Sequence, residues 1–272
     1  MENIFYLNGQ FLPEKETVIS VNDLGLLRGF GIFDFFRSVN GKVLFLEDHL
    51  DRFEFSAEKL QLEIPYSRVQ LREIIHETIK LNPAPLLGIK MILTGGYSSD
   101  GYTPTTPNMA VLAKPFTFMN KPEGMHLMTL DYLRELPEIK TLSYIVPIMN
   151  RPKMIEMGAD DYLYHKNGFV SELSRSNLFL IKNGKLITPD TNILRGITRK
   201  HILKIVENRF DITIRPVTLE ETLMADELFT SGSTKRVLGI TKIDNKPIGD
   251  GKVGKLTTEI AVLFQKHEEA SY

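Results

Sequence analysis

One acidic residue stands out in the segment from residue 163 to residue 199, LYHKNGFVSELSRSNLFLIKNGKLITPDTNILRGITR. The segment predicts a strand, an Asn-Gly turn, a strand, a second Asn-Gly turn and a third strand, because Asn-Gly between apolar runs favours tight hairpins. Glu172 lies in the middle strand among apolar and hydroxyl side chains. Because an unpaired buried charge is costly, we expect the Glu172 carboxylate to have a partner.

The same segment ends in a predicted helix that begins at Gly196-Ile197-Thr198. The first N–H groups of a helix have no partner inside the helix and suit a phosphate. A buried acid and an anion cradle this close in sequence suggest one ligand that carries a basic ring nitrogen at one end and a phosphate at the other. Pyridoxal 5'-phosphate (PLP) is such a ligand.

The composition narrows the class of protein. The chain has 272 residues, of which 42% are hydrophobic and 25% charged, as in an ordinary globular protein. Its net charge of −1 gives no support to general binding of nucleic acid or anionic membranes. The absence of cysteine removes disulfides, thiolate nucleophiles and Cys-ligated zinc. No apolar run approaches the ~20 residues of a membrane span, and residues 1–11 do not resemble a signal peptide, so a cytoplasmic protein is expected.

Four Asn-Gly pairs, two in the first 45 residues and two between 160 and 190, predict an antiparallel sheet in each half of the chain. Predicted helices follow at residues 47–62, with Leu50, Phe53, Ala57 and Leu60 on one face, and at residues 67–81, with Val69, Ile74, Ile75 and Ile79 on one face after a Ser67 N-cap. Further expected elements are two strands around GGYSSDGYTPTTP, strand 125–131, a helix near 148–157, helix 196–209, strands 212–217 and 227–230, and a last helix near 252–268. We therefore predict two α+β domains, residues 1–115 and 122–272, joined by a proline-containing linker at 116–121, with a small-molecule site in the cleft between them.

Three other patterns do not predict chemistry. The stretch from Gly249 to Leu256 matches GxxxxGK, but it ends in Leu where a nucleotide P-loop needs Ser or Thr for magnesium. The loop GGYSSDG lacks the GxSxG spacing of a nucleophile elbow. The six histidines contain no i, i+4 pair, so we expect no metal site.

The motifs taken together resemble class IV aminotransferases, the fold-type IV PLP enzymes. The resemblance runs nearly end to end, through LEDHLDR, IKTLSY, the E-x-x-x-x-N-L-F segment, ITP-x-x-x-x-ILRGITR and F-x-SGST. The family includes branched-chain transaminases, D-amino-acid transaminases and 4-amino-4-deoxychorismate lyase. The resemblance implies an α+β fold of two domains, of the D-amino-acid aminotransferase type, with PLP in the cleft between them.

Residue roles follow from the resemblance. The lysine that forms a Schiff base with PLP corresponds to Lys140, and Glu172 corresponds to the acid opposite the pyridine nitrogen. Arg52 corresponds to the phosphate-binding arginine, which agrees with the fork geometry of guanidinium. Further implied cofactor contacts are Asn177, as contact or as support for its strand, Leu194 on the ring face, and a phosphate cup of Ile197, Thr198, Gly232, Ser233 and Thr234.

The implied reaction is transamination in two halves. Lys140, displaced from PLP by the substrate amine, removes the α-proton and returns it to the cofactor, so one residue serves first as tether and then as base. A 2-oxo acid leaves, and a second oxo acid reverses the sequence.

Substrate choice is less defined. Phe35 stands two positions after Phe33, where branched-chain enzymes usually have glycine, and LTGGYSSDGYTP lacks the Arg and His of common D-amino-acid enzymes and the arginine of the lyase. The residues expected at the substrate are Phe33 and three cations that could capture its carboxylate: Arg28, Lys90 and Arg175. LLRGFGIFDFFR is similar to an atypical group of D-amino-acid transaminases.

We therefore expect an amino-acid transaminase with weak D-selectivity that acts on an amino acid and a 2-oxo acid as a homodimer, since the loop near Arg28 often enters the neighbouring subunit's site in this family. The main alternative is 4-amino-4-deoxychorismate lyase. Three further interpretations stay open: a branched-chain transaminase, a PLP-binding protein without turnover and a phosphate-binding structural module.

Overall fold

The computed structural model describes residues 2–271 and divides them into two compact units. The first unit runs to Thr117 and also includes Ile139–Ser143 and Ser271, and the second contains Phe118–Glu138 and Tyr144–Ala270. A short internal segment of the chain therefore packs with the N-terminal unit. The independence of the domains and the linker at 116–121 stay predictions.

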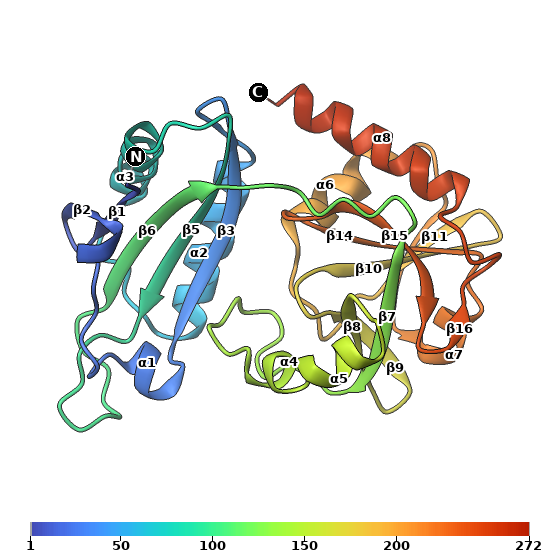
Figure 1. Cartoon of the computed structure of the whole chain (residues 1–272), viewed down its shortest axis with the longest axis horizontal. Coiled ribbons are helices and arrows are strands. Elements are labelled where there is room, and N and C mark those ends of the chain that lie inside the picture. Colours follow the sequence, from blue (N-terminus) through green and yellow to red (C-terminus); the bar gives the residue numbers. More distant parts are fainter. Residues whose placement is uncertain (1, 272) are drawn as a thin grey trace. The chain divides into compact units, whose positions relative to one another are not determined.

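The first unit is an antiparallel sheet covered on one face by two helices (Figure 1). The strand order is β2-β1-β6-β5-β3-β4. The strands are β1 (Ile4–Leu7), β2 (Gln10–Pro13), β3 (Gly31–Val39), β4 (Lys42–Val43), β5 (Leu86–Thr94) and β6 (Asn108–Pro115), and the helices are a 3-10 turn (Glu14–Glu16), α1 (Leu24–Arg28), α2 (Leu46–Lys59) and α3 (Arg68–Leu81).

Helices α2 and α3 pack on the sheet through the apolar faces that the sequence predicts, with two differences. Leu50, Phe53 and Ala57 are buried in the core of the unit, and Ser67 caps α3 in a capping box with Gln70. Leu60, the C-cap of α2, is only partly buried. Val69 is 59% exposed, since it lies in the first turn of α3.

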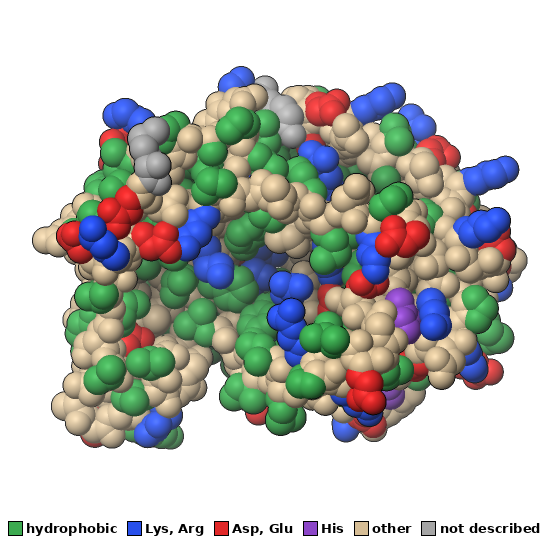
Figure 2. All heavy atoms as spheres, viewed as in Figure 1, with side chains coloured by type: hydrophobic (Ala, Val, Ile, Leu, Met, Phe, Trp, Pro, Cys, Tyr) green, Lys and Arg blue, Asp and Glu red, His purple; other side chains and the backbone are tan. Residues whose placement is uncertain are grey.

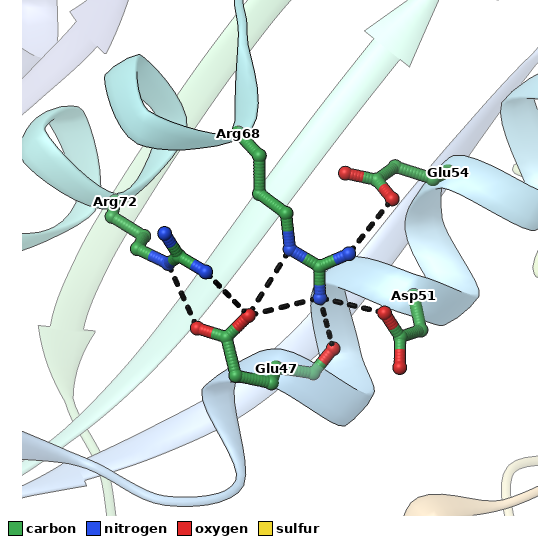
Figure 3. Close-up of polar contacts among 5 residues, drawn as sticks. All are labelled: Glu47, Asp51, Glu54, Arg68 and Arg72. Atoms are coloured by element: carbon green, nitrogen blue, oxygen red, sulfur yellow. Dashed lines mark hydrogen bonds and ion pairs between the residues drawn. The ribbon is translucent and has the colours of Figure 1, made fainter.

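The outer surfaces of α2 and α3 are joined by an ion-pair network (Figure 3). Arg68 contacts Glu47, Asp51 and Glu54, and Arg72 pairs with Glu47 through Nη2 at 2.8 Å. These groups are exposed, so each pair contributes little to stability, of order 0–1 kcal/mol. The network connects the outer face of α2 to the first turns of α3.

The second unit is built on a ten-stranded sheet, on which α6 and α8 pack through β14 and β15 (Figure 1). The strand order is β12-β11-β10-β14-β15-β7-β8-β9-β13, and β16 pairs with β15. A further pairing of β9 with β10, at Glu172 and Asn177, closes six of the strands into a ring. The strands are β7 (Met125–Asp131), β8 (Asp161–Lys166), β9 (Phe169–Leu173), β10 (Asn177–Lys182), β11 (Lys185–Thr188), β12 (Ile212–Ile214), β13 (Val217–Thr218), β14 (Glu227–Gly232), β15 (Arg236–Ile243) and β16 (Lys246–Pro247), and the helices are α4 (Ile145–Met149), α5 (Arg151–Glu156), α6 (Ile197–Val206), α7 (Leu219–Leu223) and α8 (Lys255–Glu269).

The four predicted Asn-Gly turns are confirmed. Both residues of each pair have positive φ, from 45° to 51° at the asparagines and from 74° to 97° at the glycines, as a type I′ turn requires.

Three predicted elements are wrong in detail. The middle strand of segment 163–199 is two strands, β9 and β10, because residues 174–176 form a turn in which the Leu173 N–H donates to the Ser176 carbonyl. The helix near 148–157 is the pair α4 and α5, which meet at Asn150. Strand 212–217 is interrupted at Arg215-Pro216, where proline has no N–H for the ladder.

No helix among residues 2–271 combines the length and apolar character that crossing a bilayer demands.

Candidate active site

Lys140 is fixed to the first unit by its own backbone. The Lys140 carbonyl accepts a hydrogen bond of 2.9 Å from the Phe33 N–H, and the Leu142 N–H donates to the Gly31 carbonyl at 3.0 Å. Residues 139–143 therefore lie alongside the start of β3 and pair with it through an isolated antiparallel bridge between Ile32 and Thr141. This pairing holds Lys140 beside the start of β3 without a helix or strand of its own.

Phe33 lies beneath two lysine side chains. The Lys140 Nζ is 4.6 Å from the centre of the Phe33 ring, and the Lys90 Nζ, from β5, is 5.6 Å away. Both distances fall within the range of cation–π contacts. The structure thus brings together three residues that the sequence places in the site: Phe33, Lys90 and Lys140.

Arg52, on α2, is held by a buried acid that the sequence prediction missed. Its guanidinium donates from Nε to Oδ2 and from Nη2 to Oδ1 of Asp34, each at 2.8 Å. Asp34 is fully buried and also binds the Nδ1 of His49 at 2.7 Å. Asp34 therefore fixes the orientation of the Arg52 guanidinium. The guanidinium N–H groups that do not bind Asp34 can bind another anion.

The charges of this cluster are set by burial and by the ion pair. Burial alone would raise the pKa of Asp34, but the charge of Arg52 and the hydrogen bonds from Arg52 and His49 outweigh it and hold that pKa well below its usual range. Burial lowers the pKa of His49 despite the adjacent Asp34, and Arg52 and Lys140 add to the lowering. At neutral pH the cluster therefore contains an ionised Asp34, a cationic Arg52 and a neutral His49. Because His49 is influenced by both Arg52 and Lys140, these two predicted site residues share one electrostatic neighbourhood.

Glu172, in the second unit, is a buried acid surrounded by donors. Only 3% of the residue is exposed. Its Oε2 accepts from the Leu194 N–H at 3.0 Å and lies 3.5 Å from the Asn177 Nδ2, and its Oε1 accepts from the Arg134 Nη1 at 3.2 Å. The prediction that this carboxylate needs a partner is confirmed within the protein itself.

Sequence reasoning also missed Arg134. It lies in the loop after β7, where its Nη2 also donates to the Pro137 carbonyl at 3.1 Å. Its side chain is 13% exposed, and it places a positive charge beside the Glu172 carboxylate. Its only sequence signal is its place six residues before Lys140.

Asn177 joins Glu172 to the start of α6. Its Nδ2 donates to the Leu194 carbonyl at 2.8 Å, and its Oδ1 lies where a Cβ on Gly196 would be, at 2.0 Å. Glycine is therefore required at residue 196. Among residues 2–271 no side chain caps α6 at Gly196, so the first N–H groups of this ten-residue helix remain suited to an anion.

The turn between β14 and β15 carries Ser233 and Thr234. Gly232, the last residue of β14, lies close to the turn between β9 and β10, since a Cβ on Gly232 would be 3.2 Å from the Ser176 Cβ. Ser231 pairs with Asn177 in the ladder, and its buried Oγ has no hydrogen-bond partner among the described residues. A buried hydroxyl without a protein partner is rare and indicates a place where a ligand or water binds.

Comparison with known proteins decides the family. The model of the family described as amino-transferase class IV matches residues 31–243. The chain is a class IV aminotransferase. It is 32% identical over 273 residues to a Methanocaldococcus jannaschii protein provisionally named a branched-chain-amino-acid aminotransferase, covering 96% of this chain and 94% of that protein. It is 31% identical to a D-alanine aminotransferase of Staphylococcus aureus, covering 99% of each chain.

Solved structures confirm the fold-type IV architecture. A branched-chain amino acid aminotransferase complexed with N-(5'-phosphopyridoxyl)-L-glutamate, from the source abbreviated T.th., matches with a TM-score of 0.93 at 25% identity and covers 100% of this chain and 95% of that one. The branched-chain aminotransferase from Thermoproteus uzoniensis, with norvaline, matches with a TM-score of 0.91 at 26% identity. The match covers 100% of this chain and 96% of that one.

Each unit of this aminotransferase presents residues that match chemical groups of PLP. The first unit presents an amine on Lys140 and an oriented guanidinium on Arg52. The second presents a buried carboxylate at Glu172, the uncapped start of α6 and a buried hydroxyl at Ser231 without a partner among the described residues. An amine, an acid and anion receivers are the groups that an aldehyde, a ring nitrogen and a phosphate need.

The other predicted substrate cations are less constrained. Arg28 ends α1, is exposed and donates from Nη1 to the Leu27 carbonyl at 2.9 Å. Arg175 is exposed at the turn between β9 and β10. The GxxxxGK motif does not bind an anion at α8, because Glu227 accepts from the Leu256 N–H at 3.1 Å and from the Thr257 N–H at 2.7 Å.

Proposed function

We propose that this chain exchanges an amino group between an amino acid and a 2-oxo acid at PLP, with Lys140 as tether and base. Amino-group transfer of this class follows from family membership, and PLP is the cofactor of the class. The observation that supports the residue roles best is the second unit's acid. The buried Glu172 carboxylate is paired with Arg134 and linked through Leu194 and Asn177 to the uncapped start of α6.

When bound, PLP supplies an electron sink that lets the Cα–H bond of an amino acid break. Lys140 would hold the cofactor through its Nζ, and the same Nζ would carry the proton that leaves the Cα of the amino acid. Glu172 would bind the ring nitrogen, where a carboxylate would favour the protonated form of the ring. Arg134 contacts the Glu172 carboxylate and places a positive charge beside it. In the second unit, the backbone of Ile197 and Thr198 with Ser233 and Thr234 would receive the phosphate. In the first unit, Arg52 is the proposed phosphate ligand.

We propose Lys90 as the first choice for binding a substrate carboxylate. Its ammonium shares the Phe33 ring with that of Lys140, so a carboxylate held by Lys90 lies near the reacting amine. Lys90 is exposed like Arg28 and Arg175, and it ranks above them because its ammonium contacts the Phe33 ring beside Lys140. The relatives point to two substrate classes, since they include D-alanine and branched-chain-amino-acid aminotransferases. We propose D-amino acids as the substrates, because LLRGFGIF, with its arginine, is similar to the same segment of an atypical group of D-amino-acid transaminases.

A half-reaction panel tests this proposal. The purified enzyme is loaded with PLP and mixed separately with D-alanine, D-glutamate, L-leucine, L-glutamate and 4-amino-4-deoxychorismate, while the absorbance of the cofactor is followed. Bleaching by D-alanine or D-glutamate with release of the oxo acid supports the proposal. Bleaching by L-leucine alone identifies a branched-chain enzyme, and formation of 4-aminobenzoate identifies the lyase.

The Lys140→Ala variant tests the tether, with Lys90→Ala as its matched control. We expect Lys140→Ala to lose both the absorbance band that borohydride bleaches and all turnover. Lys90→Ala should keep the band and raise KM for the amino acid. An unchanged band in Lys140→Ala refutes the assignment of Lys140.

We also propose that the enzyme is a homodimer. Apolar side chains are exposed in the first unit at Val18, Val21, Leu26 and Tyr102, and in the second at Ile145, Ile148, Met149 and Ile155, each 60% exposed or more. The second group lies on α4 and α5, where Figure 2 shows a gathering of green side chains. Exposed apolar patches of this kind mark interaction surfaces. Light scattering on the purified protein should give twice the chain mass, and Ile148→Glu should give the single mass.

A cytoplasmic location stays a prediction from the sequence.

A further inference from the structure

Lys235 is a buried lysine that the proposed mechanism does not use. It follows Ser233 and Thr234 in the turn between β14 and β15, and only 2% of its side chain is exposed. Its Nζ pairs with the Asp161 Oδ2 at 2.5 Å and donates to the Ser176 Oγ at 3.1 Å. An ammonium group buried this deeply is costly unless its partners are well placed.

Asp161, at the start of β8, extends this contact to a second turn. Its Oδ1 accepts from the Ser174 Oγ and from the Tyr162 N–H. Burial opposes ionisation of Asp161, but the charge of Lys235 and these hydrogen bonds outweigh it and lower the pKa of the carboxyl. Asp161 is therefore ionised at neutral pH and forms a buried ion pair with Lys235.

The second turn is the one that separates β9 from β10. Ser174 and Ser176 lie in it, directly between Glu172 and Asn177. The Thr230 Oγ1 donates to the Ser176 Oγ at 2.7 Å and lies 2.9 Å from the Asn177 carbonyl. The ion pair and the three hydroxyls thus form one buried network that joins the Ser233–Thr234 turn to the Ser174–Ser176 turn.

The next residue anchors the first turn in another direction. Arg236 has φ of 56°, and its Nε lies 2.6 Å from the Oε2 of the buried Glu268 on α8. Its guanidinium also stacks 3.9 Å above the ring of Phe118. Two consecutive cations therefore hold the turn to β8 and to α8.

We propose that Lys235 is a positioning residue for the phosphate end of the cofactor site. Its buried ammonium ties the turn that carries Ser233 and Thr234 to the turn beside Glu172, so that the phosphate cup and the acid keep a fixed spacing. This inference rests on the proposed function. Buried ion pairs contribute little net stability compared with apolar residues of the same size, whereas they can specify one arrangement. A displacement of about 1 Å in such a site can cost a hundredfold in rate.

The test compares Lys235→Met with Lys185→Met, which removes a lysine from an exposed ion pair with Asp211 in the same unit. Both proteins are prepared without cofactor, and the dissociation constants for PLP and for inorganic phosphate are measured by fluorescence quenching and equilibrium dialysis. We expect Lys235→Met to bind both ligands about ten- to a hundredfold more weakly. Lys185→Met should bind both like the unaltered chain.

A second variant keeps the test valid if Lys235→Met leaves Asp161 unpaired and unfolds. Lys235→Met/Asp161→Asn removes both charges and should recover the thermal midpoint of Lys185→Met while its affinity for PLP and phosphate stays weak. A double variant that binds PLP as tightly as the unaltered chain overturns the inference, because the pair would then serve folding alone. If the unaltered chain and Lys185→Met also fail to bind PLP, the proposed function itself is wrong.

Discussion

Arg52 and Asp34 form a two-point ion pair, with Nε and Nη2 of the guanidinium each 2.8 Å from a different carboxylate oxygen. The pair spans α2 and β3, and it sets the direction of the guanidinium before any ligand arrives. Asp34 has no place in the reaction itself, because it lies at 0% exposure on the face of β3 that packs against α2.

Removing the carboxylate should destabilise the first unit. Asp34→Asn leaves the charge of Arg52 buried without its anion, so we expect the free energy of unfolding to fall by about 3 kcal/mol. Urea denaturation followed by circular dichroism measures this loss. Glu47→Gln, in the exposed network of Figure 3, is the control and should cost less than ~1 kcal/mol. Equal losses in the two variants would contradict the prediction.

His49 should make stability depend on pH. Its folded-state pKa lies below the unfolded value of about 6.5, chiefly because of burial. As pH falls below about 6.5 the unfolded chain takes up a proton that the folded chain does not, so stability declines until the pH passes the folded pKa. We expect His49→Gln to flatten this decline between neutral pH and pH 5. The groups around His49, namely Asp34, Arg52 and Lys140, stay in the variant, so a slope that persists unchanged would assign it to another residue.

Gly196 should tolerate no side chain while Asn177 is present. A Cβ at residue 196 would overlap the Asn177 Oδ1 at 2.0 Å, so Gly196→Ala should lower both the thermal midpoint and the affinity for PLP. In Asn177→Ala/Gly196→Ala the overlap is gone. The double variant should therefore be more stable than Gly196→Ala alone, a coupling that a double-mutant cycle measures. Strictly additive losses would show that the two residues do not interact.

Glu172 should control rate more than cofactor binding. Glu172→Gln keeps the hydrogen-bonding shape but loses the charge that favours a protonated ring nitrogen, so we expect PLP to be retained and kcat to fall by about a hundredfold or more. Glu135→Gln, which alters an exposed acid next to Arg134, should leave kcat unchanged. Full activity in Glu172→Gln would remove Glu172 from its proposed role.

The parts of the fold that depend on neighbouring residues could be predicted from sequence. Asn-Gly turns, the Ser67 cap and the apolar face of α2 each follow from residues a few positions apart, and the structure confirms them. The break between β9 and β10 was missed, because Ser174, Arg175 and Ser176 carry no glycine or proline to signal a turn. Strand β15 was also not predicted.

The partners of the site residues were harder to predict because they are distant in sequence. Glu172 was found as an acid in an apolar strand, and the same reasoning applied to GIFDFF would have found Asp34. Its partner Arg52 lies 18 residues away, and the Arg134 partner of Glu172 lies 38 residues away. Only a folded chain shows which cation meets which acid.

Glu227, at the start of β14, binds the N-terminal end of α8. Its carboxylate receives the first N–H groups of α8, and a side chain on Gly254 would collide with it, since a Cβ there would be 1.9 Å from the Glu227 Cδ. The glycine that completes GxxxxGK is thus needed to make room for the protein's own acid. The GxxxxGK pattern in this chain therefore marks a helix end whose N–H groups already bind the protein's own carboxylate.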